Sequence, residues 1–228
     1  MGTREKDVPQ FGGNRQWYED EVPRRKVTLP DYRIARVPTT NAQYLLFVQA
    51  TGHRSPKHWE ENRPPKGKEG HPVVRVSWHD AMAYCDWLSQ VTGQRITLPS
   101  EAEWEKAARG DGDAREFPWG DTFDVTRCNS GDLGLGDTTP VGIFLEVASP
   151  YGLLDLSGNV LEWTRSVYKS YPYDPRDGRE NPEGGSARVG RGGSFHSNQR
   201  HVRCASRFRP APGRVHFSVG FRVMVAPG

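Results

Sequence analysis

The sequence predicts an α+β domain in which helices come first and short strands and loops follow. Apolar residues at helical spacing mark helices over 41–51 and about 79–91, and a third begins at Ser100. After Gly110, glycine, proline and aspartate recur every few residues, so no further helix is expected and 219–225 is the last predicted strand. Because helices do not alternate with strands, the order differs from that of a βαβ fold.

Capping residues support these helices. Ser77 and Asp80 resemble a capping pair, and Ser100 with Glu103 fits the S-x-x-E box, in which each side chain bonds the backbone of the other. Gly52 follows the first helix at the position where a left-handed residue commonly ends one. We therefore expect the three helices to begin and end close to these residues.

Two stretches predict little regular structure. Residues 1–38 form extended segments, with short runs at 26–29 and 32–35 bounded by prolines. Residues 53–72 form a long polar loop with four prolines and no apolar period. Long loops of this kind are often functional, although a family-specific insertion without a role explains the stretch equally well.

Composition indicates a globular domain. With 228 residues, 35% of them hydrophobic and 26% charged, the chain is long enough to bury a core. No apolar run approaches the roughly 18 residues of a membrane helix, and no secretory signal opens the chain. A location in the cytoplasm, or display at a surface through a missing N-terminal region, is expected. The net charge of +3 does not indicate nucleic acid, so no nucleic-acid partner is expected.

Three cysteines argue against a disulfide scaffold, because their number is odd. One disulfide is still compatible with the sequence, but buried free thiols are favoured. The three are Cys85, Cys128 and Cys204.

Nine short blocks occur in one order over nearly the whole chain, and together they are far more specific than any one alone. They are 1–3 (MGT), 21–23 (EVP), 38–44 (PTTNAQY), 72–78 (PVVRVSW), 98–105 (LPSEAEWE), 117–120 (FPWG), 158–164 (GNVLEWT), 191–195 (RGGSF) and 220–222 (GFR).

This succession resembles the formylglycine-generating-enzyme (sulfatase-modifying-factor) family. The resemblance implies a single domain over 1–228 with a C-type-lectin-like fold, which has few helices, short strands and much ordered loop. The chain begins at the methionine of the family's opening motif, so we expect it to be the C-terminal part of a longer protein.

The resemblance also implies chemistry that these residues lack. Active members oxidise a substrate cysteine to formylglycine with oxygen and bind copper(I) through two thiolates, ligands that suit a soft metal. Ser197 stands at the first thiolate position, and 198–203 contains no cysteine for the second. Cys204 matches a further family cysteine outside that pair. We therefore expect no copper and a non-catalytic domain. The alternative is a metal-dependent oxidoreductase using a different site, for which His196, His201 and His216 are the nearby candidates.

Structural calcium is a further implication of the resemblance, since the aligned positions offer the oxygen ligands that a hard cation takes. The alternative is a calcium-free loop held by Asn159 and Trp163. The better matched set is Asp155, Gly158, Val160 and Glu162, and a weaker set is Asn129, Ser130, Asp132 and Gly134.

Residues 191–222 also resemble the diversified segment of the variable proteins of diversity-generating retroelements, which is mutated at adenines of asparagine codons. Every residue at the positions expected to vary is reachable from the codon AAC by changing adenines. A plain non-catalytic family member is the equal alternative. The candidate variable and ligand-binding positions are His196, Ser197, Asn198, His201, Ser206, Phe208, Pro210, Ala211, Arg214, His216, Phe217 and Ser218. The expected constant frame is Arg191, Gly192, Gly193, Ser194, Arg203, Arg207, Gly220, Phe221 and Arg222.

The mixture of aromatic, hydroxyl, amide and arginine side chains in this segment is typical of a paratope. We therefore predict a binding module for a protein or small-molecule ligand whose identity the sequence does not name. Two alternatives stay open. Phe208 and Phe217 would be core residues in one, and in the other the arginines at 191, 200, 203, 207, 209, 214 and 222 would bind a carboxylate or phosphate partner.

Overall fold

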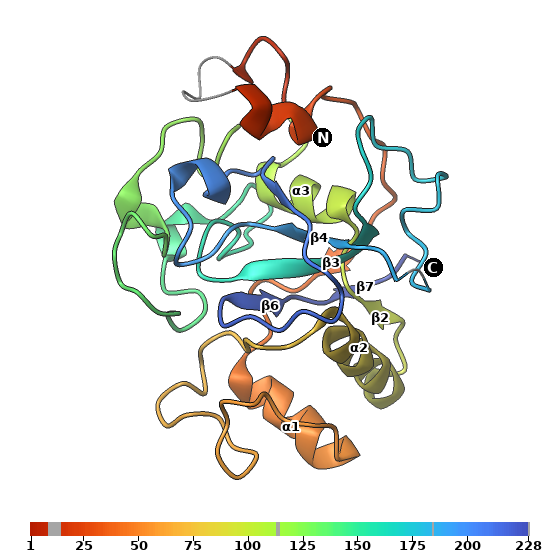
Figure 1. Cartoon of the computed structure of the whole chain (residues 1–228), viewed down its shortest axis with the longest axis vertical. Helices are drawn as coiled ribbons and strands as arrows, with labels where there is room; N and C mark the ends of the chain where they lie inside the picture. Colours follow the sequence, from red (N-terminus) through yellow and green to blue (C-terminus); the bar gives the residue numbers. More distant parts are fainter. Residues whose placement is uncertain (9–14, 113–114, 184, 228) are drawn as a thin grey trace.

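A computed structural model describes residues 1–8, 15–112, 115–183 and 185–227 of the chain. A four-stranded sheet lies at its centre, with helix α3 (Glu101–Arg109) on one face and helices α1 (Asn41–Thr51) and α2 (Trp78–Thr92) on the other (Figure 1). Helices and short strands are joined by long ordered loops, which confirms the predicted α+β class. In the part of the chain described, no helix is long and apolar enough to cross a membrane.

The three predicted helices are confirmed together with their caps. Thr40, Ser77 and Ser100 each close a capping box in which side chain and backbone bond reciprocally. Each cap satisfies backbone donors that have no partner inside the helix and contributes about 1 kcal/mol. Gly52 and Gly93 end α1 and α2 in the left-handed conformation, with φ of 68° and 66°.

Two sheets organise the strands. The central sheet has the order β5-β4-β3-β6 and comprises β5 (Arg207–Phe208), β4 (Arg188–Arg191), β3 (Leu161–Val167) and β6 (Val219–Phe221). The smaller sheet has the order β1-β7-β2 and comprises β1 (Arg33–Ile34), β7 (Met224–Val225) and β2 (Ile96–Thr97). All pairings are antiparallel except that of β3 with β6.

The single last strand predicted over 219–225 is wrong, because the chain changes sheets within it. β6 pairs with β3, whereas β7 pairs with β1 and β2. Between them the buried Arg222 turns its guanidinium to Glu162 on β3. The change of sheet between β6 and β7 depends on this tertiary contact, which local sequence patterns do not predict.

The N-terminal region departs from the prediction in one place. Residues Arg15–Glu21 form a 3-10 helix instead of an extended segment, and it brings Glu21 to Arg203 from the far end of the chain. The run at 26–29 has no regular secondary structure, and 33–34 of the second run form β1. Predictions for 9–14 lie outside the described residues, and the loop over 53–72 has no helix or named strand, as expected.

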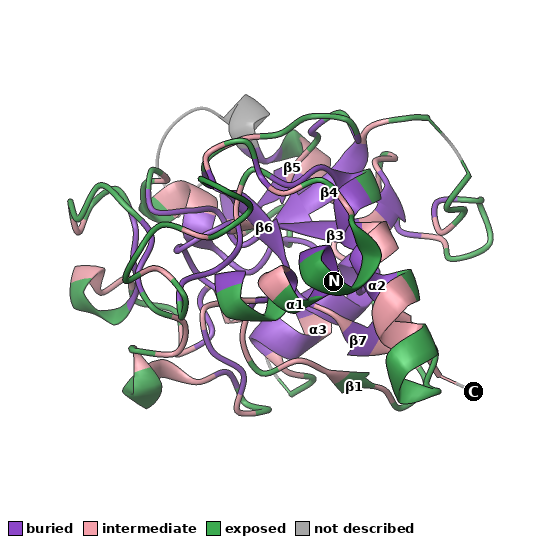
Figure 2. Ribbon diagram, turned by 90° about the horizontal axis from the view of Figure 1, so that it is seen from below, coloured by how far each residue is buried: buried purple, intermediate pink, exposed green. Residues whose placement is uncertain are grey.

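Alternation along β3 builds two cores, because successive side chains of a strand point to opposite faces. Trp163 packs with the α1–α2 side, and its indole N–H donates to the Val76 carbonyl at 3.1 Å. Glu162 faces α3, where the Trp104 indole donates to its Oε2 at 2.8 Å. Most residues of the central strands are buried, while exposed residues lie mainly in the surrounding loops (Figure 2).

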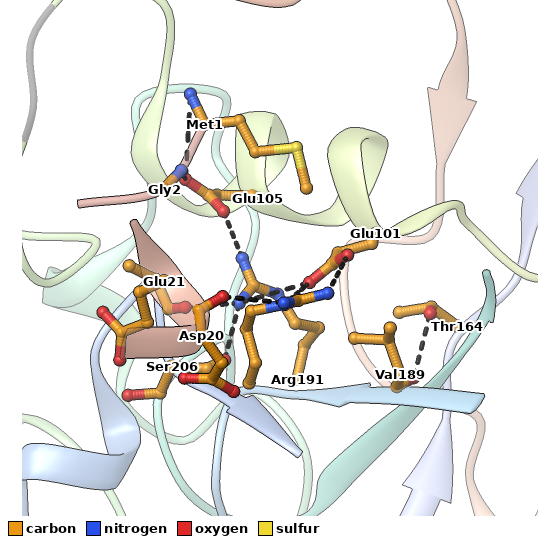
Figure 3. Close-up of polar contacts among 12 residues, drawn as sticks. Met1, Gly2, Asp20, Glu21, Glu101, Glu105, Thr164, Val189, Arg191 and Ser206 are labelled. Atoms are coloured by element: carbon orange, nitrogen blue, oxygen red, sulfur yellow. Dashed lines mark hydrogen bonds and ion pairs between the residues drawn. The ribbon is translucent and has the colours of Figure 1, made fainter. Parts of the chain in front are cut away.

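Buried arginine–glutamate pairs join the C-terminal third of the chain to α3, β3 and the N-terminal region. Arg191 Nη2 bonds Glu105, and its Nη1 donates to the Ala205 and Ser206 carbonyls (Figure 3). The other fully desolvated pairs are Arg207–Glu101, Arg203–Glu21 and Arg222–Glu162, at 2.6, 2.5 and 2.7 Å.

These pairs decide between two interpretations of the C-terminal arginines. Four of them are buried and ion-paired with glutamates, namely Arg191, Arg203, Arg207 and Arg222. The interpretation that they bind an external carboxylate or phosphate is therefore wrong for these four. Arg209 and Arg214 are exposed. The expected constant frame thus has a physical basis, since each buried arginine satisfies a carboxylate that would otherwise be buried uncompensated.

Glu162→Gln should lower the free energy of unfolding by about 3–5 kcal/mol, because it leaves the Arg222 charge buried without its partner. The matched control is Glu146→Gln, an exposed glutamate for which we expect a change within about 0.5 kcal/mol. Urea unfolding of both variants measures the difference. Equal stability of the two variants would contradict the role assigned to the pair.

Candidate ligand-binding site

A hollow of about 350 Å³ opens in the C-terminal third, between the loop after β4 and the segment from β5 to β6. This C-terminal hollow is lined by Leu161, Ser194, His196, Ser197, Phe208, Arg209, Pro210, Arg214, His216, Ser218 and Val219.

Most of the side chains predicted as ligand-binding meet at this hollow. The loop after β4 supplies His196 and Ser197. Residues on and after β5 supply Phe208, Pro210, Arg214, His216 and Ser218.

The remaining predicted positions lie beside the hollow or beneath the surface. Asn198 is exposed, and His201 packs on the Phe208 ring with centroids 5.7 Å apart. Ser206 is buried, and its hydroxyl donates to the Arg200 carbonyl at 2.8 Å. Ser206 therefore belongs to the frame by its surroundings, and the sequence pattern placed it with the exposed set.

Four rings pack together next to the hollow, and we call them the Phe217 cluster. The Phe217 ring lies 4.7 Å from His196 and 4.2 Å from His216, and His196 in turn packs on Phe195 at 4.3 Å. Phe217 is 38% exposed, and Phe208 is half-buried. The alternative that these two phenylalanines are core residues is therefore wrong, because both reach the surface.

The thiols of the chain are buried, separate and protonated, unlike the paired thiolates that bind copper(I). Cys85, Cys128 and Cys204 are free and buried, and each belongs to a different hydrophobic cluster. Burial raises the pKa of Cys128 and of Cys204 to about 12, so both stay protonated at neutral pH. At the position expected for the first copper thiolate, Ser197 Oγ accepts the Ser194 N–H at 3.0 Å. The predicted free thiols are confirmed.

The three C-terminal histidines do not converge. His196 and His216 each contact the Phe217 ring, and His216 Nδ1 hydrogen-bonds Ser218 Oγ at 2.9 Å. The His201 Nε2 contacts Arg200 Nη2 at 3.1 Å instead. Among the described residues, no three histidine, cysteine, aspartate or glutamate side chains are grouped as a metal site requires.

In the better matched calcium set, Glu162 already has a counter-charge from Arg222. Its two oxygens accept the Arg222 Nε and Nη2 groups and the Trp104 indole. Asp155 is its one remaining side-chain carboxylate. The Asp155 Oδ2 accepts the Gly142 N–H at 2.6 Å, while burial, with the Glu162 charge adding to it, raises the pKa of Asp155 to about 6.

The loop between Asp155 and Glu162 is held by the contacts that the calcium-free alternative requires. The Asn159 side chain bonds the N–H and the carbonyl of Thr139, at 3.0 and 3.3 Å, and its own N–H donates to the Asn129 carbonyl at 2.7 Å. Gly158 packs so closely on Asn129 that a Cβ would lie 2.1 Å from the Asn129 carbonyl oxygen.

Two members of the weaker calcium set already accept other hydrogen bonds. Asp132 accepts the Gln199 N–H at 2.6 Å, and the Ser130 carbonyl accepts the N–H groups of Leu133 and Gly134 in a turn. The Asn129 Oδ1 is buried without a hydrogen-bond partner among the described atoms. The Ser130 Oγ is buried without a partner there as well, and a hard cation or a water molecule would satisfy both oxygens. Calcium binding at either set stays a prediction.

Sequence reasoning missed the apolar wall formed by Leu161 and Val219, and it named Arg209 only in the alternative in which the arginines bind a carboxylate or phosphate partner. Arg209 lies between two predicted positions, Phe208 and Pro210, and local spacing was the available signal. Leu161 was not accessible to such reasoning, because β3 and β6 pair in parallel across more than fifty residues of chain.

Asp155→Asn should raise stability at pH 7.5 in EDTA by about 1 kcal/mol, a value reduced for the partial exposure of the side chain. The folded pKa of about 6 is above the unfolded value of about 3.9. The protonated form is therefore favoured in the folded state, and this contribution is lost as pH rises through 6. Asparagine also tolerates the positive φ of 57° at this position.

Thermal unfolding at pH 4 and pH 7.5 measures this effect, with little difference expected at pH 4. A variant less stable than the wild type at pH 7.5 in EDTA would contradict it. The same experiment with added calcium tests the metal prediction, which requires a rise in Tm for the wild type that Asp155→Asn lacks.

The chain is similar to several proteins over most of its length. It is 34% identical over 230 residues to the serine/threonine-protein kinase Pkn1 of Chlamydia trachomatis serovar L2, a match covering 92% of this chain and 36% of the kinase. The chain thus spans about a third of that relative. It is 31% identical to the formylglycine-generating enzyme of Thermomonospora curvata, covering 92% of this chain and 86% of the enzyme.

Solved structures agree with this result. PvdO from Pseudomonas aeruginosa aligns with a TM-score of 0.81 and 28% identity, covering 99% of this chain and 89% of PvdO. Treponema denticola variable protein 1 aligns with a TM-score of 0.78 and 23% identity, covering 99% and 91%. Residues 2–227 match the sulfatase-modifying factor enzyme 1-like domain, and the chain therefore belongs to the formylglycine-generating-enzyme family, on the fold that its nine sequence blocks predict.

Proposed function

We propose that this domain is a non-catalytic binding module that uses the C-terminal hollow and the adjoining Phe217 cluster to hold a protein ligand. The observation that carries the proposal is the gathering of side chains predicted from separate parts of the C-terminal segment at one hollow. Their chemistry is that of an adaptable recognition surface, with aromatic rings for contact area and hydroxyl, imidazole and guanidinium groups for hydrogen bonding.

The division between frame and surface supports a binding role. Arg191, Arg207 and Arg222 are buried in ion pairs below the hollow, whereas Arg214 and His196 are exposed at it. Rigid elements that present variable loops are the usual architecture of a binding site. The surface can therefore accept many side chains without loss of the fold.

The residues present do not supply the chemistry of the family's enzymes. A serine replaces the first thiolate, and all three thiols are buried, in separate clusters. Since function belongs to the site and not to the fold, similarity to formylglycine-generating enzymes does not by itself bring their reaction to this chain. Oxygen consumption with cysteine-containing peptides tests this part, and turnover at enzyme-like rates would overturn it.

The finer proposal is that the surface is diversified. The likeness to Treponema denticola variable protein 1 concerns the fold, so the support comes from the positions themselves. His196, Arg214, His216 and Phe217 are at least partly exposed, and changes there cost little stability.

Sequencing the gene from many isolates tests diversification. Substitutions should concentrate at the exposed positions at and beside the hollow and spare Arg191, Arg207 and Arg222, whose carboxylate partners would be left uncompensated. Ser206 should change rarely because it is buried. Substitutions spread evenly over 191–222 would exclude the diversified reading and leave the binding module intact.

The binding surface can be tested with peptides selected on the immobilised domain from a random display library. Selected peptides should lose affinity by about tenfold or more on Phe217→Ala or Arg214→Ser, since aromatic and arginine side chains dominate binding energies. Phe217→Ala should cost about 1 kcal/mol or less in stability because the ring is 38% exposed.

The control for this selection is Arg176→Ser, whose side chain is 89% exposed and does not line the hollow. Isothermal titration gives the dissociation constants. Peptides that bind all three variants as tightly as the wild type would place the binding surface elsewhere.

A further inference from the structure

A second cavity, of about 300 Å³, lies behind the C-terminal hollow between α1, α2 and the start of the polar loop over 53–72. We call it the α1–α2 cavity. Tyr44 and Asp80 come from the two helices, Arg54 and Lys57 from the polar loop, and Arg75 from the segment before α2. The volume is at the lower end of the range found for small-molecule sites, about 300–1,000 Å³.

The segment between β5 and β6 separates the two spaces. Gly213 and Val215 line the α1–α2 cavity, whereas Arg214 and His216 line the C-terminal hollow. The Arg75 N–H donates to the His216 carbonyl at 3.0 Å and fixes the segment against the cavity rim. The cavity is thus a separate site with its own lining.

Tyr44 lines this cavity with an unsatisfied hydroxyl. Its side chain is 0% exposed, and the Tyr44 hydroxyl has no hydrogen-bond partner within the described part of the chain. Stacking on Tyr84 at 5.8 Å and an edge contact with Phe47 at 5.2 Å hold the ring in place. A buried donor without a partner is costly, so this hydroxyl is positioned for an acceptor that the protein itself does not provide.

The walls carry an excess of positive charge. Asp80 is the one acidic residue of the lining. Its carboxylate already accepts the Ser77 N–H and hydroxyl and contacts His53 and Arg54. Arg75 and Lys57 are exposed, and among the described residues neither forms an ion pair. Arg75 also has a φ of 61°, a conformation uncommon outside glycine, asparagine and aspartate.

We propose that the α1–α2 cavity binds a small ligand through an oxyanion group. One oxygen of this group accepts a hydrogen bond from the Tyr44 hydroxyl, and its negative charge faces Arg75 and Lys57. Phosphate and carboxylate share this chemistry, since both pair with guanidinium and ammonium groups. The Arg54 side chain is 70% exposed, so it can move to admit the ligand. The polar loop thereby acquires a function that its sequence alone left open.

The experiment titrates the whole chain with inorganic phosphate and, separately, with citrate, at constant ionic strength set by sodium chloride. We expect saturable binding of at least one anion by isothermal titration. A rise in Tm of about 3–6 °C should accompany an anion concentration of ten times Kd. Binding of phosphate alone or citrate alone identifies the group, and competition between them shows one shared site.

Three variants make the assignment specific. Arg75→Asn removes the charge with a residue that tolerates the positive φ, and Tyr44→Phe removes only the hydroxyl; each should weaken binding about tenfold or more. Arg214→Ser removes the same charge on the other side of the segment and should bind as the wild type does. In chloride, Tyr44→Phe should keep the wild-type Tm, because the lost hydroxyl has no partner in the protein.

Four results would overturn the proposal. They are the absence of saturable binding by both anions, equal weakening by Arg75→Asn and Arg214→Ser, full affinity in Tyr44→Phe, and a loss of Tm in chloride for Tyr44→Phe. The C-terminal hollow can fail its own peptide test without affecting any of these measurements.

Discussion

The buried arginine–glutamate pairs are the interaction on which the rest of this structure depends. Arg191, Arg203, Arg207 and Arg222 come from the last third of the chain and meet glutamates of α3, β3 and the N-terminal 3-10 helix. Burying such charges is expensive, and the cost is recovered only when geometry and hydrogen bonding are complete. We infer that the pairs specify one arrangement of a loop-rich chain more than they add to its stability.

This frame explains how so irregular a segment can present a defined surface. Between Arg191 and Arg222 the chain forms short strands and the 3-10 helix Gln199–Val202, and ion pairs hold several points along it to the core. The residues between the ties, among them His196, Arg214 and Phe217, are free to face solvent. A binding surface can change while the fold persists when the buried residues stay constant and the exposed residues tolerate substitution.

The two cavities share one segment of the chain and differ in chemistry. The C-terminal hollow is bordered by packed aromatic rings and hydroxyl groups, which suits an adaptable contact surface. The α1–α2 cavity offers cationic walls and an orphaned tyrosine hydroxyl, which suits a small anion. Neither cavity carries the paired thiolates of the family's copper chemistry. The fold of the family is therefore kept here without these residues of its reaction.

By itself, the sequence determined the three helices with their main caps, the family, and most of the side chains that line the C-terminal hollow. These follow from local hydrogen bonding, from period, and from motifs read in order. Only the tertiary structure decided the switch of strands at Arg222, the 3-10 helix at Arg15–Glu21 and the burial of Ser206. The same is true of Glu162. The sequence predicted its carboxylate as a calcium ligand, whereas in the structure this carboxylate pairs with Arg222. The reason is that an ion pair depends on residues distant in sequence, and no local pattern records which charge will be buried beside which.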